Sequence, residues 1–151
     1  MLQTEDSRID SIAIKPARRP SKTFLPVDIV TDEELKPIKH IIGTVSLGHV
    51  ELFAQQMANG YGFGNDSGQV MFSGDPGIEP EIEPFEGVMF MDFFEDQVVM
   101  SRDAFWRFMD RLFTTLIEIA NERKLKILDE PRWPVFLEHA ARIKQLAGET
   151  S

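Results

Sequence analysis

The stretch GVMFMDFFEDQVVMS, residues 87–101, decides the fold of this chain. Two hydrophobic runs with high strand propensity, 87–92 and 97–100, flank the polar pair Glu95-Asp96, which lies where a turn is needed. We therefore predict a β-hairpin. Strands joined by so short a connection pair in antiparallel fashion, so the sheet that contains them should be antiparallel.

The residues after the hairpin predict the longest helix of the chain. Ser101 is a good N-cap, and the apolar residues that follow recur at helical spacing and form a wide stripe that must face a core. A last helix opens at residues 129–131 and ends at Gly148. The stripe of the longest helix consists of Phe105, Phe108, Met109, Leu112, Phe113, Leu116 and Ile119.

Upstream of the hairpin the sequence predicts two helices, a glycine turn and one more strand. Residues 31–34 have the form of a capping box with Thr31 as the N-cap. A second helix begins near Ser46 and stops at the Asn-Gly pair before the glycine turn of residues 60–64. These glycines are unlike a phosphate-binding loop, because residues 69–72 read as a strand and no helix with a Lys follows them.

Together these elements predict an α+β fold, in which a small antiparallel sheet of about three to four strands packs against four or so helices. We expect residues 25–151 to form a single domain and residues 1–24 to form an irregular basic arm, with a short edge strand at 11–14 as an option. The arm has no interleaved aromatic residues, which favours a solvated tail over a nucleic-acid-binding segment. Its basic residues are Lys15, Arg18, Arg19 and Lys22.

The totals are those of an ordinary soluble domain of 151 residues with 42% hydrophobic residues. The absence of cysteine excludes disulfides, zinc thiolates and Cys nucleophiles. No apolar run approaches the roughly 18 residues of a membrane span, and the first residues lack the features of a signal peptide. We therefore expect a cytoplasmic protein that does not enter a membrane.

The net charge of −9 comes from the middle of the chain. Residues 1–40 carry seven bases and seven acids, and residues 102–151 carry nine bases and eight acids. The segment between them contains no Lys or Arg. This predicts a negative electrostatic field that repels nucleic acid and attracts a cationic partner. A role in solubility alone explains such a charge equally well. The ten acids of this segment are Glu51, Asp66, Asp75, Glu79, Glu81, Glu83, Glu86, Asp92, Glu95 and Asp96.

The sequence contains no constellation typical of catalysis or metal binding. The carboxylates between Glu79 and Glu86 are close enough for acid–base pairs, but a Pro-rich loop keeps such groups solvated and ionised. They also lack calcium-loop spacing. The three histidines, His40, His49 and His139, are far apart and lack zinc-site spacing. We expect no enzymatic activity, no metal and no cofactor.

Three segments carry a resemblance to a known family: GYGF at 60–63, PFEGVMF at 84–90, and EDQVVMS at 95–101 running into Phe105. Together they look like the ribonuclease-toxin immunity proteins of bacterial contact-dependent growth inhibition systems, over about one third of the chain. The resemblance implies a cytoplasmic, antitoxin-like protein without catalytic activity. Such a protein binds and neutralises the C-terminal nuclease domain of a cognate toxin.

Charge and resemblance together predict an acidic surface that binds a basic nuclease toxin domain, with no direct contact to nucleic acid. The alternatives are a regulatory or adaptor domain that binds another basic protein, and a carboxylate-based hydrolase with a concave pocket around residues 79–86. The sequence leaves the oligomeric state open. The residues predicted to bind the partner are Glu79, Glu81, Glu83, Glu86, Asp92, Glu95 and Asp96.

Overall fold

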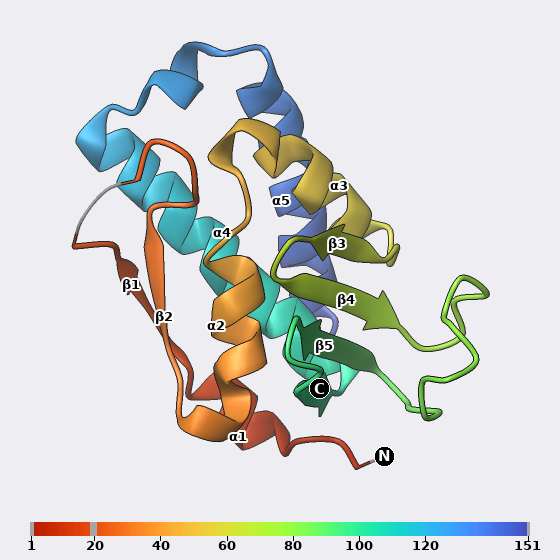
Figure 1. Ribbon diagram of the computed structural model, residues 1–151. Helices are drawn as coiled ribbons and strands as arrows, with labels where there is room; N and C mark the ends of the chain where they lie inside the picture. Colours follow the sequence, from red (N-terminus) through yellow and green to blue (C-terminus); the bar gives the residue numbers. More distant parts are fainter. Residues whose placement is uncertain (1, 19–20, 151) are drawn as a thin grey trace.

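The computed structural model describes residues 2–18 and 21–150 of the chain. Its longest element is α4 (Arg102–Arg123), which crosses the molecule in Figure 1. The helix begins where the sequence predicts, because the Ser101 hydroxyl accepts a hydrogen bond from the Ala104 N–H at 3.0 Å. This bond satisfies a donor that the first helical turn leaves unpaired.

The apolar stripe of α4 faces the core, as predicted. All seven of its large apolar residues are at most 2% exposed. The last helix, α5, contacts both α4 and α3, so that three helices pack together. Their bounds, with the short 3-10 turns that precede them, are η2 (Leu47–His49), α3 (Val50–Ala58), η3 (Lys126–Asp129) and α5 (Arg132–Gly148).

The predicted hairpin forms one side of a four-stranded antiparallel sheet with the order β3-β4-β5-β6. Val88 lies opposite Met100 in its register. Because side chains alternate along a strand, Val88 and Phe90 enter the main core, while Met89 faces the other side of the sheet. The strands are β3 (Phe63–Asn65), β4 (Gly68–Phe72), β5 (Val88–Asp92) and β6 (Gln97–Met100).

Strand β3 occupies part of the glycine-rich stretch for which the sequence predicts only a turn. Asn65 of β3 pairs with Gly68 of β4, and the Asn65 side chain accepts the Ser67 N–H at 2.9 Å within the turn between them. Gly68 has a φ of +151°, and a Cβ at this position would collide with the Met91 carbonyl oxygen. The glycine therefore allows β4 to approach β5 closely.

The N-terminal segment, predicted to be an irregular arm, contains a helix and a strand. Helix α1 (Asp6–Asp10) contacts α4, and β1 (Ala13–Pro16) pairs with β2 (Val27–Val30) in a second antiparallel sheet. Ile9 and Ile12 are buried, at 0% and 4% exposure. These two apolar residues therefore anchor the segment in the core. The prediction of an arm gave more weight to the basic residues that follow them. One of those basic residues, Arg19, lies outside the described residues.

Helix α2 (Lys36–Ile42) lies between the two sheets (Figure 1) and contacts strands of both. It follows the 3-10 turn η1 (Glu33–Leu35). The N-cap of this turn is Asp32, whose carboxylate accepts the Leu35 N–H at 3.2 Å, so the predicted cap at Thr31 is wrong by one residue.

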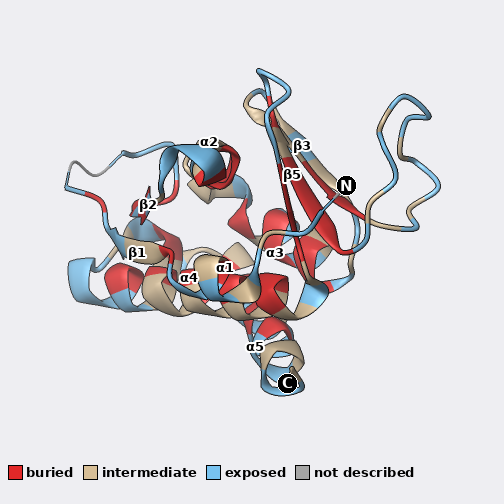
Figure 2. Ribbon diagram, turned by 90° about the horizontal axis from the view of Figure 1, so that it is seen from below, coloured by how far each residue is buried: buried red, intermediate tan, exposed pale blue. Residues whose placement is uncertain are grey.

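The fold is α+β, as predicted, with five helices and two antiparallel sheets within the described residues. The four-stranded sheet matches the prediction, whereas the two-stranded sheet was not expected as a separate unit. Figure 2 shows buried residues where the sheet meets the helices and exposed residues along the loop between β4 and β5. Among helices of the described chain, none has the length and apolar character needed to cross a membrane.

Candidate functional site

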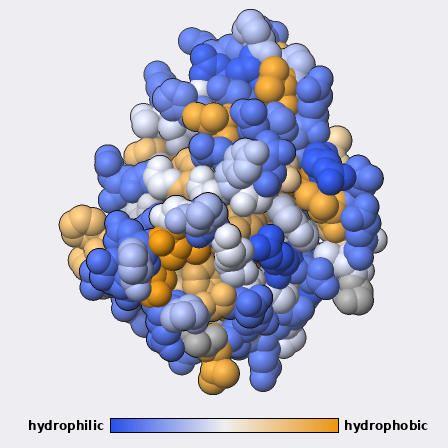
Figure 3. Space-filling view, turned by 90° about the vertical axis from the view of Figure 1, so that its right-hand side faces the viewer, coloured by the Kyte–Doolittle hydropathy of each residue, from blue (hydrophilic) through white to orange (hydrophobic). Residues whose placement is uncertain are grey.

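The loop between β4 and β5, residues 73–86, carries four of the predicted acidic residues, and we call it the acidic loop. Its apolar residues pack against Met71, Met89 and Val99 on the outer face of the sheet. This packing leaves the intervening carboxylates exposed to solvent, and Figure 3 shows hydrophilic residues interrupted by hydrophobic patches on this side of the molecule. The apolar residues that face the sheet are Ile78, Ile82 and Phe85, and the exposed carboxylates are Glu79, Glu81, Glu83 and Glu86.

The turn between β5 and β6, residues 92–96, presents two aromatic side chains to solvent, and we call it the aromatic turn. Phe93 is 75% exposed and Phe94 is 73% exposed. Glu95 is also exposed, and Asp96 forms a 3.3 Å ion pair with Lys36 of α2. Hydrogen bonds from Lys36 to Glu33 and to Asp96 raise the pKa of its ammonium group. Apolar side chains of this size and exposure beside ionised groups are typical of interaction surfaces.

Asp92 does not belong to the exposed acidic surface in which the sequence placed it. It is 3% exposed, because strand alternation puts it on the same face of β5 as Phe90, toward α2. One carboxylate oxygen accepts the backbone N–H groups of Phe94 and Asp96 at 3.0 and 3.1 Å. The other lies 3.1 Å from Nδ1 of His40. Asp92 therefore supports the turn from within and offers no surface for a partner.

The six exposed carboxylates fall into two groups at opposite ends of the hairpin. The acidic loop joins the beginning of β5, and the aromatic turn follows its end (Figure 1). A strand of five residues, at about 3.3 Å per residue, separates these ends by roughly 13 Å. The predicted residues therefore form two surfaces, one with Glu79, Glu81, Glu83 and Glu86 and the other with Glu95 and Asp96.

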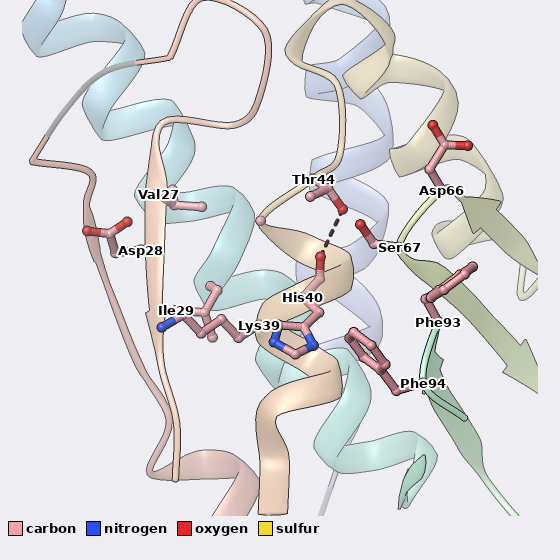
Figure 4. Close-up of a pocket in the computed structure, with 11 residues that line it drawn as sticks. Val27, Asp28, Ile29, Lys39, His40, Thr44, Asp66, Ser67, Phe93 and Phe94 are labelled. Carbon is pink, nitrogen blue, oxygen red and sulfur yellow. Dashed lines mark hydrogen bonds between the residues drawn. The ribbon is translucent and has the colours of Figure 1, made fainter. Parts of the chain in front are cut away.

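A groove of about 480 Å³ lies beside the aromatic turn, between strand β2, helix α2 and the β3–β4 turn. Phe94 points toward His40, and Phe93 points away from His40 to the other side of the turn (Figure 4). An ionised carboxylate only accepts hydrogen bonds, so the Asp92 contact is a hydrogen bond in the tautomer of His40 that carries a proton on Nδ1. The groove thus has one wall made of a helix and another made of an exposed aromatic pair.

The groove holds an oriented imidazole, and among the described residues no hydroxyl group forms a hydrogen bond with it. A histidine held by a carboxylate is a common proton-transfer unit. However, the Thr44 hydroxyl donates to the backbone carbonyls of His40 and Ile41, at 2.8 and 3.2 Å, and so is not directed at the imidazole. Among the described residues no group of three His, Asp or Glu side chains is arranged to hold a metal ion.

A second, smaller cavity of about 250 Å³ lies where the hydrolase alternative predicts one, next to the acidic loop. Of the five carboxylates on that loop, only Asp75 and Glu79 line it. The Asp75 carboxylate accepts the Gly77 N–H at 2.8 Å and thereby stabilises the loop. The cavity does not gather the carboxylates that the alternative requires.

Sequence reasoning missed the aromatic turn and the contact between His40 and Asp92. These two residues are 52 positions apart, and no local spacing connects them. The exposure of the aromatic pair could have been anticipated. Successive side chains of a strand point to opposite faces of the sheet, so Phe93 and Phe94 cannot both face the same core.

Comparison with known proteins finds no family model, no curated protein and no solved structure that matches this chain.

Proposed function

We propose that this chain is an immunity protein, which binds and neutralises the basic nuclease domain of a toxin. The family resemblance implies that this nuclease domain is a ribonuclease. It acts by occupying the toxin's surface and has no catalytic role of its own. The observation that carries the proposal is the exposure of the acidic loop, whose apolar residues are held against the sheet while its carboxylates face solvent.

Three carboxylates of the acidic loop have no ion-pair partner among the described residues, although Arg102 of α4 hydrogen-bonds to Ser73 where the loop begins. Residues 41–101 contain no Lys or Arg that could supply such a partner. The three carboxylates are those of Glu79, Glu81 and Glu86. A nuclease that grips a phosphate backbone is basic where it binds its substrate. An acidic surface therefore attracts such a domain and competes with the nucleic acid for the same cations.

The resemblance supports the same function from a different direction. Two of its three segments include parts of β5 and β6 and the N-cap of α4, and the third ends at the first residue of β3. They describe the scaffold that holds the acidic loop and the aromatic turn. A complex of standard size buries about 1,600 Å² in total, which is large enough to include both surfaces.

The proposal is tested by producing the chain together with the toxin encoded by the neighbouring gene, and by measuring survival and complex formation. The triple variant Glu79→Gln, Glu81→Gln and Glu86→Gln should slow association about tenfold at low salt and much less at high salt, because rim charges mainly set the association rate. Its matched control removes three exposed carboxylates from α4 and α5, through Glu118→Gln, Glu122→Gln and Glu138→Gln, and should associate at the wild-type rate.

Two outcomes would contradict the proposal. A chain that neither protects cells nor binds the toxin domain is not its immunity protein, and binding to a different basic protein in that case would favour the adaptor alternative. Equal effects of the two triple variants would show that net charge matters and that the acidic loop has no special role.

A further inference from the structure

We propose that the aromatic turn is the preformed anchor of the complex, and that Phe93 and Phe94 enter an apolar pocket with a cationic rim on the partner. This inference rests on the proposed function, because it takes the partner to be a basic protein domain. It assigns Phe93 and Phe94 a role that neither the charge pattern nor the resemblance indicates.

The first argument is the exposure of the two rings. They are 75% and 73% exposed and pack edge to face with their centroids 5.8 Å apart. Each Phe side chain offers about 150–250 Å² for burial, so the pair presents roughly 300 Å² of apolar surface. Interface anchors are often aromatic residues of this kind that become fully covered in the complex.

The second argument is the rigidity of the turn that carries them. The Asp92 N–H donates to the Asp96 carbonyl at 3.0 Å, and the Glu95 N–H donates to the Asp92 carbonyl at 2.9 Å. The Phe93 N–H donates to the Ser67 carbonyl at 2.8 Å, which ties the turn to the neighbouring β3–β4 turn. These bonds add to those of the buried Asp92 carboxylate. A turn held in this way has little conformational freedom left to lose on binding.

The third argument identifies the partner from the charges around the rings. Asp66 is exposed on the β3–β4 turn, to which the Phe93 N–H is bonded through Ser67. Glu95 is exposed within the aromatic turn itself. An exposed cation near the rings is Lys39 of α2, which lies along the groove. An apolar pocket that receives the rings would meet these carboxylates at its rim, where Arg or Lys side chains complement them. A second copy of this chain fits poorly, because two proteins with a net charge of −9 repel each other.

The experiment compares three variants of the full chain with the wild type by binding kinetics with the toxin domain from the neighbouring gene. The variant Phe93→Ala and Phe94→Ala should dissociate about 100-fold faster and associate within about threefold of the wild-type rate. The control variant Leu52→Ala and Tyr61→Ala removes side chains that are 47% and 62% exposed elsewhere, and it should bind like the wild type. The acidic-loop variant should show the opposite pattern, with slower association.

Each outcome separates the anchor from the function. If the wild-type chain does not bind the toxin domain, both proposals fail. If it binds, and the acidic loop matters while the Phe93 and Phe94 variant keeps the wild-type dissociation rate, only the anchor is refuted. Concentration-dependent dimers that the same variant abolishes, without any effect on toxin binding, would assign the rings to self-association and would also refute the anchor.

Discussion

The substitution Asp92→Ala tests whether a buried carboxylate holds the aromatic turn in place. The side chain accepts two backbone N–H groups through one oxygen and contacts His40 through the other, at distances of 3.0–3.1 Å. A hydrogen bond to a charged group contributes about 1.5–3 kcal/mol, and the lower end applies where water can reach the freed donors. Water can replace the carboxylate at Phe94 and Asp96, which are exposed. The two hydrogen bonds to backbone N–H groups, at about 1.5 kcal/mol each, therefore account for a loss of about 3 kcal/mol in the free energy of unfolding.

Urea denaturation of the full chain measures this loss. Asp92→Asn keeps one oxygen in place as an acceptor for the two N–H groups, so it should cost only about 1 kcal/mol. The control Asp96→Ala removes an exposed carboxylate paired with Lys36 and should change stability by less than about 0.5 kcal/mol. Hydrogen exchange at the Phe94 amide should accelerate in the Ala variant. A loss below about 1 kcal/mol for Asp92→Ala, or an equal loss for the Ala and Asn variants, would refute this account.

Three further predictions concern the frame around the site. Ser101→Ala should lower the free energy of unfolding by about 1–2 kcal/mol in urea denaturation, because the hydroxyl caps α4 and also donates to Asp6 at 2.8 Å; an unchanged midpoint would contradict the cap. Gly68→Ala should destabilise the sheet by several kcal/mol or prevent folding, since its Cβ would strike the β5 backbone; a soluble variant with a wild-type melting curve would disprove that collision. The hydrogen bond from Arg8 holds the pKa of Asp32 below its usual value, so the stability from this pair is complete above the ordinary carboxyl pKa and is lost as pH falls through the lowered one. Arg8→Ala should raise the pKa of Asp32 in an NMR titration, and an unchanged titration curve would show that the contact is unimportant.

The sequence predicts the second half of the chain well because its signals are local. The hairpin and α4 follow from strand propensity, a turn and a cap that lie within 35 residues of one another. The N-terminal sheet depends on pairs such as Ile14 with Ile29, which are separated by a loop that carries no hairpin signature. Its helix, α1, has only five residues and is held by contacts from α4, such as the Arg107 ion pairs with Asp6 and Asp10. Local propensity does not reveal elements that exist through tertiary packing.

For the candidate site, charge counting found the acidic loop but gave the wrong place for Asp92. The segment without bases is continuous in sequence, whereas the strands divide its carboxylates between two ends of a hairpin. The alternation of β5 was visible in the sequence, and it already placed Asp92 on the face of Phe90. Its partner His40 comes from α2, and only the tertiary structure brings the two residues together.

The separation of the two surfaces leads to a last prediction, on their independence. If the chain binds a basic toxin domain as proposed, charges of the acidic loop should act mainly before contact and the rings of the aromatic turn after it. About 13 Å of strand lies between the surfaces, and sites more than about 7–10 Å apart change free energies additively within roughly 0.5 kcal/mol. A variant that combines the substitutions at Glu79, Glu81 and Glu86 with those at Phe93 and Phe94 should therefore weaken binding by the product of the two separate factors.

Measured dissociation constants for the wild type, both partial variants and the combined variant complete a double-mutant cycle. A coupling energy above about 1 kcal/mol would mean that both ends of the hairpin engage one continuous feature of the toxin, or that the acidic loop moves when it binds. Either result would contradict a division of the hairpin into one end that attracts the partner and another that holds it.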